Sequence, residues 1–452
     1  MVEEILIVGG GFAGLAAGVA LAEAGRRVRL LEQKPHLGGR ARSFADPTTG
    51  AVVDNGQHLF MGCYHATQRF LTEIGTLDRL RFQPRLTVHF LEGQGRLTSL
   101  ECPNLPAPWH LLLGVLQSNS FTWRQKLQII RLGRTFAAGR SSRPSGSEDH
   151  LTVEDWLAHL GQSEKLRRDF WDLISIAALN EDPRLASALF LERVLRLALF
   201  TSPEDSRLGV CRVGLSDCYT DAAKNYLEAR SGKVELSRNV TQLLIKDGVC
   251  EGVKLVDGET IPAPVVLSAV PWFQLPLLLP GDLLRSEPFF GGMTALRPAP
   301  IISLNLWFDR PVTHVEFAGL RGTTFQWLFN RSRILGSGDN CLSLVLSGAH
   351  GHIGRPKEDL TALALRDLCD LLPSVHGARV IHSLLLKERF ATFSPTWDVE
   401  GVRPTAATPV RGLYLAGDWT ATGLPATIEG AVQSGYAAAR AILQGELEST
   451  SR

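Results

Sequence analysis

The stretch Ile5-Leu6-Ile7-Val8-Gly9-Gly10-Gly11-Phe12-Ala13-Gly14-Leu15 decides the fold, because a short apolar run passes straight into a Gly-x-Gly-x-x-Gly turn. The run is typical of a buried parallel strand. The helix that follows, with Phe12 and Ala13 in its first turn, points its N–H groups at a pyrophosphate. Gly9 is expected to make the tight turn, Gly11 to admit the phosphates, and Gly14 to let helix and strand pack closely. Because glycine-rich turns are common, a plain strand-turn-helix is the alternative.

A second strand and a carboxylate follow at the spacing of a dinucleotide-binding fold. We expect a helix over residues 13–24, stopped by Gly25, and a strand over residues 27–31 that ends at Glu32. About 20 residues past the glycines, a carboxylate accepts hydrogen bonds from ribose hydroxyls and repels a 2′-phosphate. Glu32, with its neighbours Gln33 and Lys34, is therefore predicted to bind the ribose of FAD or NAD rather than NADP.

The next motif, Gly38-Gly39-Arg40, distinguishes between these two cofactors. A flavin enzyme needs a second backbone approach to the pyrophosphate with an arginine beside it, whereas an NAD-dependent dehydrogenase does not. The combination with Glu32 favours FAD.

The last motif lies near the other end of the chain, at Gly417-Asp418 followed by Ala426-Thr427-Ile428. A strand meets a turn and then a helix whose N-terminus is predicted to face the flavin. Asp418 is expected to accept from the ribityl chain or to act near the pyrophosphate. N–H groups around Thr427 and Ile428 would stabilise negative charge on the reduced ring.

Composition and charge exclude several classes of partner. The formal net charge of +1, with both signs mixed along the chain, gives no basis for a nucleic-acid partner. The seven cysteines form no CxxC pair and no metal-ligand spacing with histidines, so we expect no metal and a reducing cytoplasm. Glu3 and Glu4 precede the uncharged residues 5–22 where a signal would carry Lys or Arg, so neither a targeting segment nor a transmembrane helix is expected.

The predicted fold class is α/β, with a discontinuous Rossmann-like FAD-binding domain and an α+β substrate domain in which helices cover a mixed sheet. A chain of 452 residues is too long for one simple core. The FAD-binding domain is expected to comprise residues 1–60, 225–290 and 400–452. The substrate-binding domain, with a helical insertion, is expected to comprise residues 61–224 and 291–399.

Within the substrate domain, Thr152-x-x-Asp155 has the form of a capping box and predicts a helical region that lasts to about residue 200. Runs of β-forming residues at 301–308, 324–329 and 342–346 predict a sheet floor. Leu304, Leu306 and Phe308, or the side chains on the other face, would form an apolar wall.

Residues 102–116 are interrupted by prolines and then strongly apolar. They form either a flap that dips into a membrane or a helix buried in the substrate domain. Residues 139–150 are polar and predict a solvated loop.

The order of these motifs spans the whole chain and resembles the large FAD family that contains flavin amine oxidases and phytoene-type desaturases. In that family the segment matching Asp54-x-Gly56-Gln57-His58 lies against the isoalloxazine. The resemblance also implies that Val240 makes a backbone contact near the adenine end, and that the strand before Pro271 leads back to the substrate domain.

Two segments are more specific: residues 416–432, and Glu388-Arg389-Phe390-Ala391-Thr392-Phe393-Ser394-Pro395 upstream. Together they are similar to the squalene-associated FAD-dependent desaturases of bacterial hopanoid pathways, now understood as hydroxysqualene dehydroxylases. The resemblance implies reductive removal of an allylic hydroxyl from a long-chain isoprenoid, hydroxysqualene, to give squalene. The hydrocarbon character of that substrate, together with the apolar segment at 102–116, leads us to expect peripheral membrane contact, in a protein of the cytoplasm or of the inner face of the cytoplasmic membrane.

Such a reaction needs a group that protonates or hydrogen-bonds the leaving hydroxyl, and a site that excludes water. His58 is the first candidate acid, and a structural histidine bonded to backbone is the alternative. Asp54 is expected to order the turn that carries it rather than to act as the acid, and Arg389 is a further polar candidate for contact with the leaving hydroxyl. No second Gly-x-Gly-x-x-Gly places an NADPH site, so the electron donor is either NADPH at an unidentified site or a separate reductase.

Three other functions compete with this one. A carotenoid-type desaturase differs in the direction of electron flow rather than in scaffold. A flavin amine oxidase is disfavoured because Thr427 stands where that subgroup places an aromatic residue. A non-catalytic binder of prenyl lipids is disfavoured by intact phosphate-binding motifs at both ends of the chain.

Overall fold

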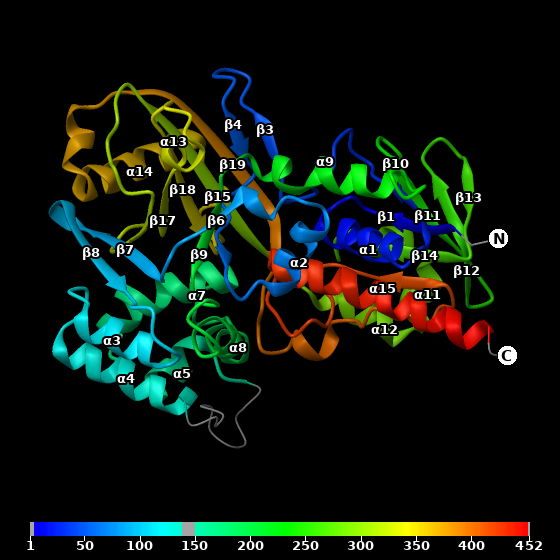
Figure 1. The fold of residues 1–452 in the computed structure, drawn as a ribbon, viewed down its shortest axis with the longest axis horizontal. Helices are drawn as coiled ribbons and strands as arrows, with labels where there is room; N and C mark the ends of the chain where they lie inside the picture. The colour runs from blue at the N-terminus through cyan, green and yellow to red at the C-terminus, as the bar shows by residue number, and fades with distance from the viewer. Residues whose placement is uncertain (1–3, 138–149, 451–452) are drawn as a thin grey trace.

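The computed structural model describes residues 4–137 and 150–450, and it has two layered parts that lie side by side (Figure 1). One part surrounds α1 (Phe12–Glu23) and contains both the start and the end of the described chain. The other contains a large sheet, with α14 (Lys357–Leu371) at one side and a group of helices at the other. Nearly all of the predicted loop at 139–150 falls outside the described residues.

The first part is built on a five-stranded sheet in which every neighbouring pair is parallel. Its order is β10 (Lys233–Glu235), β2 (Arg27–Leu31), β1 (Glu4–Val8), β14 (Val265–Ser268) and β20 (Leu413–Leu415). The central strand β1 is buried from Ile5 to Val8, which explains why its sequence is a continuous apolar run.

Three helices cover this sheet: α1, α9 (Leu215–Glu228) and α15 (Ile428–Thr450). The helix α15 packs so closely on α1 that a Cβ on Gly435 would lie 2.3 Å from the backbone oxygen of Ala13. The apolar face of α9 joins the same buried cluster as α1, although most of α9 falls within the range predicted for the substrate domain. Burial of that face against α1 holds α9 in the first part.

A three-stranded antiparallel sheet extends the first part, with strands β11 (Val240–Lys246), β12 (Val249–Leu255) and β13 (Thr260–Pro262). The Asp247-Gly248 turn between β11 and β12 has positive φ at both residues, 50° and 74°, as a two-residue hairpin of this type requires.

The second part is a seven-stranded sheet, and it confirms the predicted mixed sheet because only the β16–β7 pair is parallel. Its order is β19 (Val380–Phe393), β15 (Pro298–Phe308), β18 (Cys341–Ser347), β17 (Trp327–Asn330), β16 (Phe317–Leu320), β7 (Thr87–Glu92) and β8 (Arg96–Glu101). The strand expected at 324–329 begins only at Trp327; before it, the Thr324 N–H donates to the Asp367 carboxylate at 3.0 Å instead of to a neighbouring strand.

The two faces of strand β15 have different partners. Leu304, Leu306 and Phe308 pack with the buried face of α14. The alternate residues, Ser303 and Asn305 among them, lie on the opposite face. The apolar side chains of that face, Trp327, Phe329 and Val345, belong to the cluster shared with the helices, so this is the face available to form a substrate wall.

The helices on that side include α3 (Trp109–Gln117), α4 (Trp123–Ala137), α5 (Val153–His159), α7 (Asp172–Leu179) and α8 (Ala188–Leu199). The side chain of Thr152 accepts from the Asp155 N–H at 3.1 Å, as the capping box predicts. Asn180 ends α7 with a φ of 53°. Other short elements are β3 (Ser43–Ala45), β4 (Val52–Asp54), β5 (Phe60–Met61), β6 (Leu80–Phe82), β9 (Leu208–Cys211), α2 (His65–Glu73), α6 (Glu164–Leu166), α10 (Leu275–Leu278), α11 (Gly281–Ser286), α12 (Pro288–Gly291) and α13 (Arg331–Leu335). No helix within the described residues is long and apolar enough to cross a membrane.

Candidate functional site

The glycine turn after β1 has the geometry of a phosphate site. Gly9 has a φ of 110°, and a Cβ on Gly14 would lie 2.0 Å from the Gly9 oxygen, so both positions need glycine for the turn itself. A Cβ on Gly11 would meet no heavy atom within 4 Å. Gly11 thus faces open space at the N-terminus of α1, where the N–H groups of Phe12, Ala13 and Gly14 have no partner within the helix.

Glu32 is buried beside this turn and holds its backbone. One carboxylate oxygen accepts from the Gly10 N–H at 2.8 Å and the other from the Lys34 N–H at 2.9 Å. The segment before β11 runs alongside, because Arg238 N donates to the Glu32 backbone oxygen at 2.8 Å and Ser237 N to the Lys34 oxygen at 3.0 Å. Val240, the first residue of β11, follows two residues after this contact, and Gln33 is exposed between the bonded residues.

Arg40 connects three distant parts of the chain. Its guanidinium donates to Asp418 Oδ1 at 2.6 Å and to the Ala391 backbone oxygen of β19 at 2.7 Å. Gly38 N donates to the Gly10 oxygen at 2.9 Å, and a Cβ on Gly39 would lie 3.5 Å from Gly11 Cα. The two glycine motifs therefore face each other across a short distance, with Arg40 and Asp418 at one end.

Arg403 stabilises the turn that carries Asp418 through hydrogen bonds to its backbone. This guanidinium is fully buried and donates to the backbone oxygens of Trp419 at 3.2 Å, Leu424 at 2.8 Å and Asp418 at 3.1 Å. A Cβ on Gly417, whose φ is 150°, would lie 2.3 Å from the Trp419 indole nitrogen. That nitrogen donates to the Val270 oxygen at 3.1 Å, which places Pro271 beside the same turn.

Helix α15 begins at the predicted position. Thr427 Oγ1 accepts from the Gly430 N–H at 3.0 Å, which leaves the N–H groups of Ile428 and Glu429 without a partner inside the helix. The Glu429 carboxylate accepts from Thr67 N at 2.9 Å and Ala66 N at 3.0 Å, so α15 also caps α2. Ala426 and Thr427 remain partly exposed just before the helix.

These features fit FAD. Open space at Gly11, two glycine turns facing one another, the buried Glu32 carboxylate beside them and a second free helix N-terminus occur together, and they suit the phosphates, the ribose and the isoalloxazine ring of FAD. The residues that would hold the cofactor are Gly9, Gly11, Phe12, Ala13, Gly14, Glu32, Gly38, Gly39, Arg40, Asp418 and Ile428. Among the described residues, no group of His, Cys, Asp and Glu is suited to hold a metal.

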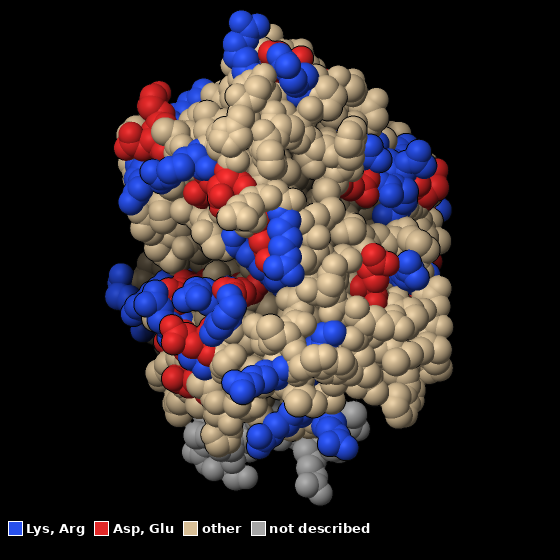
Figure 2. All heavy atoms as spheres, turned by 90° about the vertical axis from the view of Figure 1, so that its left-hand side faces the viewer, with Lys and Arg blue, Asp and Glu red and all other residues tan. Residues whose placement is uncertain are grey.

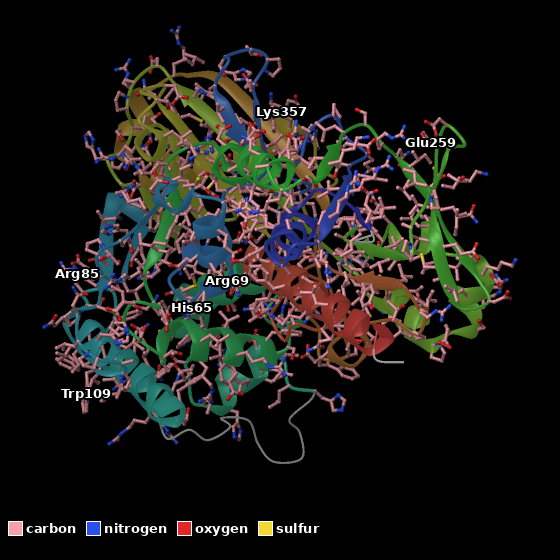
Figure 3. All side chains as sticks on the ribbon, turned by 45° about the vertical axis from the view of Figure 1, so that its right-hand side comes forward. His65, Arg69, Arg85, Trp109, Glu259 and Lys357 are labelled. Carbon is pink, nitrogen blue, oxygen red and sulfur yellow. The ribbon has the colours of Figure 1, made fainter. Side chains whose placement is uncertain are left out.

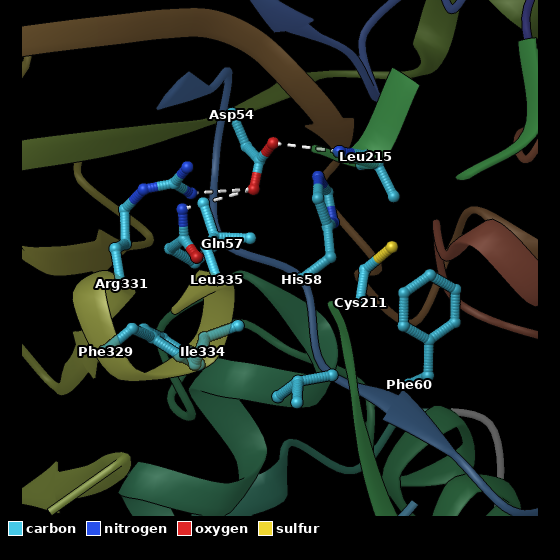
Figure 4. Close-up of a pocket in the computed structure, with 11 residues that line it drawn as sticks. Asp54, Gln57, His58, Phe60, Cys211, Leu215, Phe329, Arg331, Ile334 and Leu335 are labelled. Carbon is cyan, nitrogen blue, oxygen red and sulfur yellow. Dashed lines mark hydrogen bonds and ion pairs between the residues drawn. The ribbon is translucent and has the colours of Figure 1, made fainter. Parts of the chain in front are cut away.

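A narrow pocket lies next to this region, where the loop after β4 meets α13 (Figure 4). Asp54 and Arg331 form a buried ion pair of 2.8 Å, with side-chain exposures of 12% and 3%. The other Asp54 oxygen accepts from Ser43 Oγ at 2.7 Å and from Leu215 N at 3.1 Å. Because both oxygens are engaged, Asp54 orders this loop rather than exchanging a proton.

His58 lies in the same pocket, close to Asp54 (Figure 4). Burial lowers the pKa of His58 below its ordinary value of 6.5, and the Asp54 charge opposes that shift only in part. The loop is joined to the cofactor site, since Asn55 Nδ2 donates to the Arg40 backbone oxygen at 3.1 Å. A neutral His58 is therefore placed between the flavin motifs and the large sheet, with Gly56 and Gln57 before it.

The sheet wall beside His58 carries polar groups in an otherwise apolar surface. A Cβ on Gly56 would lie 3.9 Å from both His58 Nε2 and Ser303 Oγ, so the two side chains approach the same point. Asn305 and its cross-strand partner Ser343 are fully buried on the same face as Ser303. Within the described part of the chain, neither the two Asn305 amide atoms nor the hydroxyls of Ser303 and Ser343 find a hydrogen-bond partner. Such groups are costly to bury without one.

Arg389, the other predicted polar candidate, is exposed on β19. It lies two residues before Ala391, which accepts from Arg40, and no interaction draws it toward His58. The structure therefore brings His58 and Asp54 together and leaves Arg389 at the surface.

Several residues of the site carry no sequence signal. Arg331 and Arg403 lie outside every motif, and only their burial reveals them. Tyr219 of α9 stacks on Phe12 at 3.7 Å, and its hydroxyl donates to the backbone oxygens of Gly38 and Ala41 at 2.9 and 2.7 Å. It supports both glycine turns from a helix more than 170 residues away.

Fold and site together define an FAD-dependent oxidoreductase. The family model described as flavin containing amine oxidoreductase matches residues 12–443, and the chain belongs to that family. It is 30% identical to the hydroxysqualene dehydroxylase of Rhodopseudomonas palustris, with 98% of this chain and 99% of that protein aligned. It is 28% identical to the 15-cis-phytoene desaturase of an Oncidium hybrid cultivar, over 98% of this chain and 78% of the relative. Among solved structures, an oxidoreductase from Methanosarcina mazei has the same fold, with a TM-score of 0.74 at 17% identity over 98% of this chain and all of the other.

Proposed function

We propose that the protein removes the hydroxyl of hydroxysqualene reductively to form squalene. The single observation that carries the proposal is the polar set Ser303, Asn305 and Ser343 on the sheet face that approaches His58 through Ser303, because these buried groups lack a partner in the described chain. An allylic alcohol offers such groups a hydroxyl, whereas a hydrocarbon such as phytoene offers none. The similarity to a hydroxysqualene dehydroxylase over nearly the whole length of both chains supports the same choice.

The reaction is balanced when the alcohol takes up one hydride and one proton and releases water. Reduced FAD, when bound at this site, would supply the hydride. His58 is the group we assign to the leaving oxygen: its imidazole donates a hydrogen bond to that oxygen and passes its proton to it as the carbon–oxygen bond breaks, while its other ring nitrogen takes up a proton that comes from solvent. Asp54, fixed by Arg331, holds the loop that presents His58.

The apolar part of the wall supports the chemistry in a second way. Trp327, Phe329 and Val345 are buried on the face that carries Asn305, and they exclude bulk water from an allylic cation that water would otherwise capture. The same side chains would pack against the hydrocarbon chain of the substrate. We expect NADPH or a separate reductase to supply the electrons that reduce the cofactor.

An end-point assay tests this proposal. The purified holoenzyme, reduced chemically and kept anaerobic, is incubated with hydroxysqualene, and the products are separated by mass spectrometry. Squalene formed in proportion to enzyme supports the proposal. Unchanged hydroxysqualene, alongside desaturation of phytoene by the oxidised enzyme with an added electron acceptor, would assign the protein to the desaturases.

The variant Asn305→Leu tests the substrate class separately. It replaces the buried amide with an apolar side chain of similar size, so the fold and the bound FAD are expected to persist. The dehydroxylase proposal predicts a higher KM and a lower kcat for hydroxysqualene. An unchanged KM and kcat would show that Asn305 does not bind the substrate hydroxyl.

A further inference from the structure

Helices α3 and α4 present an apolar surface to solvent at one corner of the molecule. Trp109, Trp123 and Leu127 have exposed fractions of 60%, 68% and 64%, although all three are large apolar residues. Figure 3 shows Trp109 at the outer edge of the structure, on the side opposite Glu259. Exposed apolar residues that stand singly need no explanation, but a cluster on two adjoining helices does.

The spacing of these residues gives each helix a continuous stripe. On α4, Trp123, Leu127, Ile130 and Arg134 follow one another at intervals of four, three and four residues and so share one face. On α3, Trp109, Leu112, Leu113 and Leu116 are spaced three, one and three residues apart and also share one face, and that helix has no Asp, Glu, Lys or Arg. The two helices pack against each other, since Lys126 Nζ of α4 donates to the Leu116 backbone oxygen at 2.6 Å. Val115 of α3 and Leu132 and Phe136 of α4 are buried in the main cluster, and Ile130 packs against it. The part of the α4 stripe that faces solvent is therefore Trp123, Leu127 and Arg134.

The charge around the stripes has one sign. Between residues 102 and 137 the chain has no Asp or Glu, and α4 carries Arg124, Lys126, Arg131 and Arg134. Arg124, Arg131 and Arg134 are exposed. Figure 2 faces this side of the molecule and shows several Lys and Arg side chains at its lower end within uncharged surface. The Lys126 ammonium lies 4.9 Å from the centre of the Trp123 ring, which keeps a cation next to the most exposed indole.

We propose that this surface, formed by Trp109, Leu113, Trp123, Leu127, Arg124, Arg131 and Arg134, docks the protein on a membrane with anionic lipids. Tryptophan prefers the level of the lipid headgroups, leucine inserts just below it, and arginine pairs with phosphate. A protein partner with an acidic, apolar groove would meet the same charge, but the two tryptophans placed beside leucine stripes favour lipid. The surface contains no residue of the cofactor site or of the His58 pocket, so the proposal does not depend on the reaction assigned above.

The position of α3 bears on the two alternatives for residues 102–116, a flap that dips into a membrane or a helix buried in the substrate domain. Residues 109–117 form a half-buried helix, because His110, Gly114 and Val115 are buried while Trp109 is exposed. Docking would place one face of a fixed helix in the interface and leave its other face in the protein core.

Vesicle sedimentation tests the proposal directly. The holoenzyme is mixed with vesicles of equal parts phosphatidylglycerol and phosphatidylcholine, and with vesicles of phosphatidylcholine alone. We expect binding to the first, weaker binding to the second, and loss of the difference at high salt. The variant Trp123→Ser/Leu127→Ser should bind the anionic vesicles roughly tenfold less, and Arg124→Gln/Arg131→Gln should lose the preference for anionic lipid.

A matched control uses an equally exposed apolar residue elsewhere. Val256 is exposed by 68% and directly follows β12, a strand that lies at the opposite end of the molecule from α3 and α4 (Figure 1), so Val256→Ser should leave vesicle binding unchanged. The flavin absorbance of every variant reports whether the fold persists. Equal binding by wild type and Trp123→Ser/Leu127→Ser, or an equal loss in Val256→Ser, would overturn the proposal. A change from dimer to monomer in Trp123→Ser/Leu127→Ser without vesicle binding by the wild type would assign the surface to a second copy of the chain.

Discussion

Arg331 and Asp54 form a buried ion pair of 2.8 Å that joins residues 277 positions apart and fixes the loop carrying His58. The pair links the large sheet to the region of the flavin motifs, because Arg331 follows directly after β17 and Asp54 ends β4. The position of His58 therefore depends on Arg331, a residue outside all the sequence motifs described above.

Removal of Arg331 should be strongly destabilising. In Arg331→Met the Asp54 carboxylate stays buried without its cation, and we expect the free energy of unfolding to fall by about 3 kcal/mol. Denaturant titration measures this change. The double variant Asp54→Asn/Arg331→Met removes both charges and should recover part of the loss. If the double variant loses as much free energy of unfolding as Arg331→Met and Asp54→Asn lose in sum, the pair does not act as a unit.

His58 should make the protein less stable in acid. Its pKa is lowered in the folded protein, so the neutral imidazole is favoured there and protonation favours the unfolded chain. The stabilisation is complete above the ordinary pKa of 6.5 and declines as the pH falls below it. Unfolding curves at several pH values should show this decline in wild type and a smaller one in His58→Asn. An identical pH dependence in the two proteins would contradict the burial of a neutral His58.

Alanine substitutions at Gly11 and Gly14 should impair different properties, FAD affinity at Gly11 and the stability of the apoprotein at Gly14. Gly11→Ala meets no protein atom, so the apoprotein should keep its stability while its affinity for FAD falls by on the order of tenfold or more. Gly14→Ala brings a methyl group against the Gly9 oxygen, so it should destabilise the apoprotein itself. Flavin titration and thermal unfolding of the apoproteins separate these results. Full FAD affinity in Gly11→Ala would mean that the phosphates do not pass there.

Arg403 should be essential for the Asp418 turn. The guanidinium of Arg403 bonds four backbone oxygens, those of Asp418, Trp419, Thr420 and Leu424, whereas a lysine ammonium has three donors. Arg403→Lys would therefore leave at least one buried backbone oxygen without a partner and cost about 3 kcal/mol. Loss of FAD on gel filtration reports the damage to the turn. Arg193→Lys is the matched control, because Arg193 donates to the Gly423 oxygen of the same loop at 3.1 Å but is 37% exposed. Equal FAD retention in both variants would contradict the role assigned to Arg403.

The local motifs could be predicted from sequence because each depends on neighbouring residues. The strand at 27–31 and the Asp247-Gly248 turn follow from short-range patterns of apolar residues and glycine. The position of α9 could not be predicted, since its apolar face suits either part of the molecule, and only the packing of Tyr219 on Phe12 decides between them.

The candidate site was predictable to a similar extent. Gly11, Glu32, Arg40 and Asp418 stand in motifs whose spacing has a chemical reason, and the structure brings their segments together. Arg331 and Arg403 lie in ordinary sequence, and a buried arginine differs from an exposed one only through contacts made across the fold. The polar atoms of Asn305 and Ser343 could not be recognised either, because a strand pattern does not show which residues lack partners.

The direction of electron flow tests the central claim most directly. In an anaerobic single-turnover experiment, the reduced holoenzyme is mixed with hydroxysqualene or with phytoene, and the absorbance of oxidised flavin is followed. A hydroxysqualene dehydroxylase oxidises its flavin with hydroxysqualene, forms one squalene for each flavin, and shows no change with phytoene. Flavin that stays reduced with hydroxysqualene, in an enzyme whose oxidised form is bleached by phytoene, would contradict the assignment.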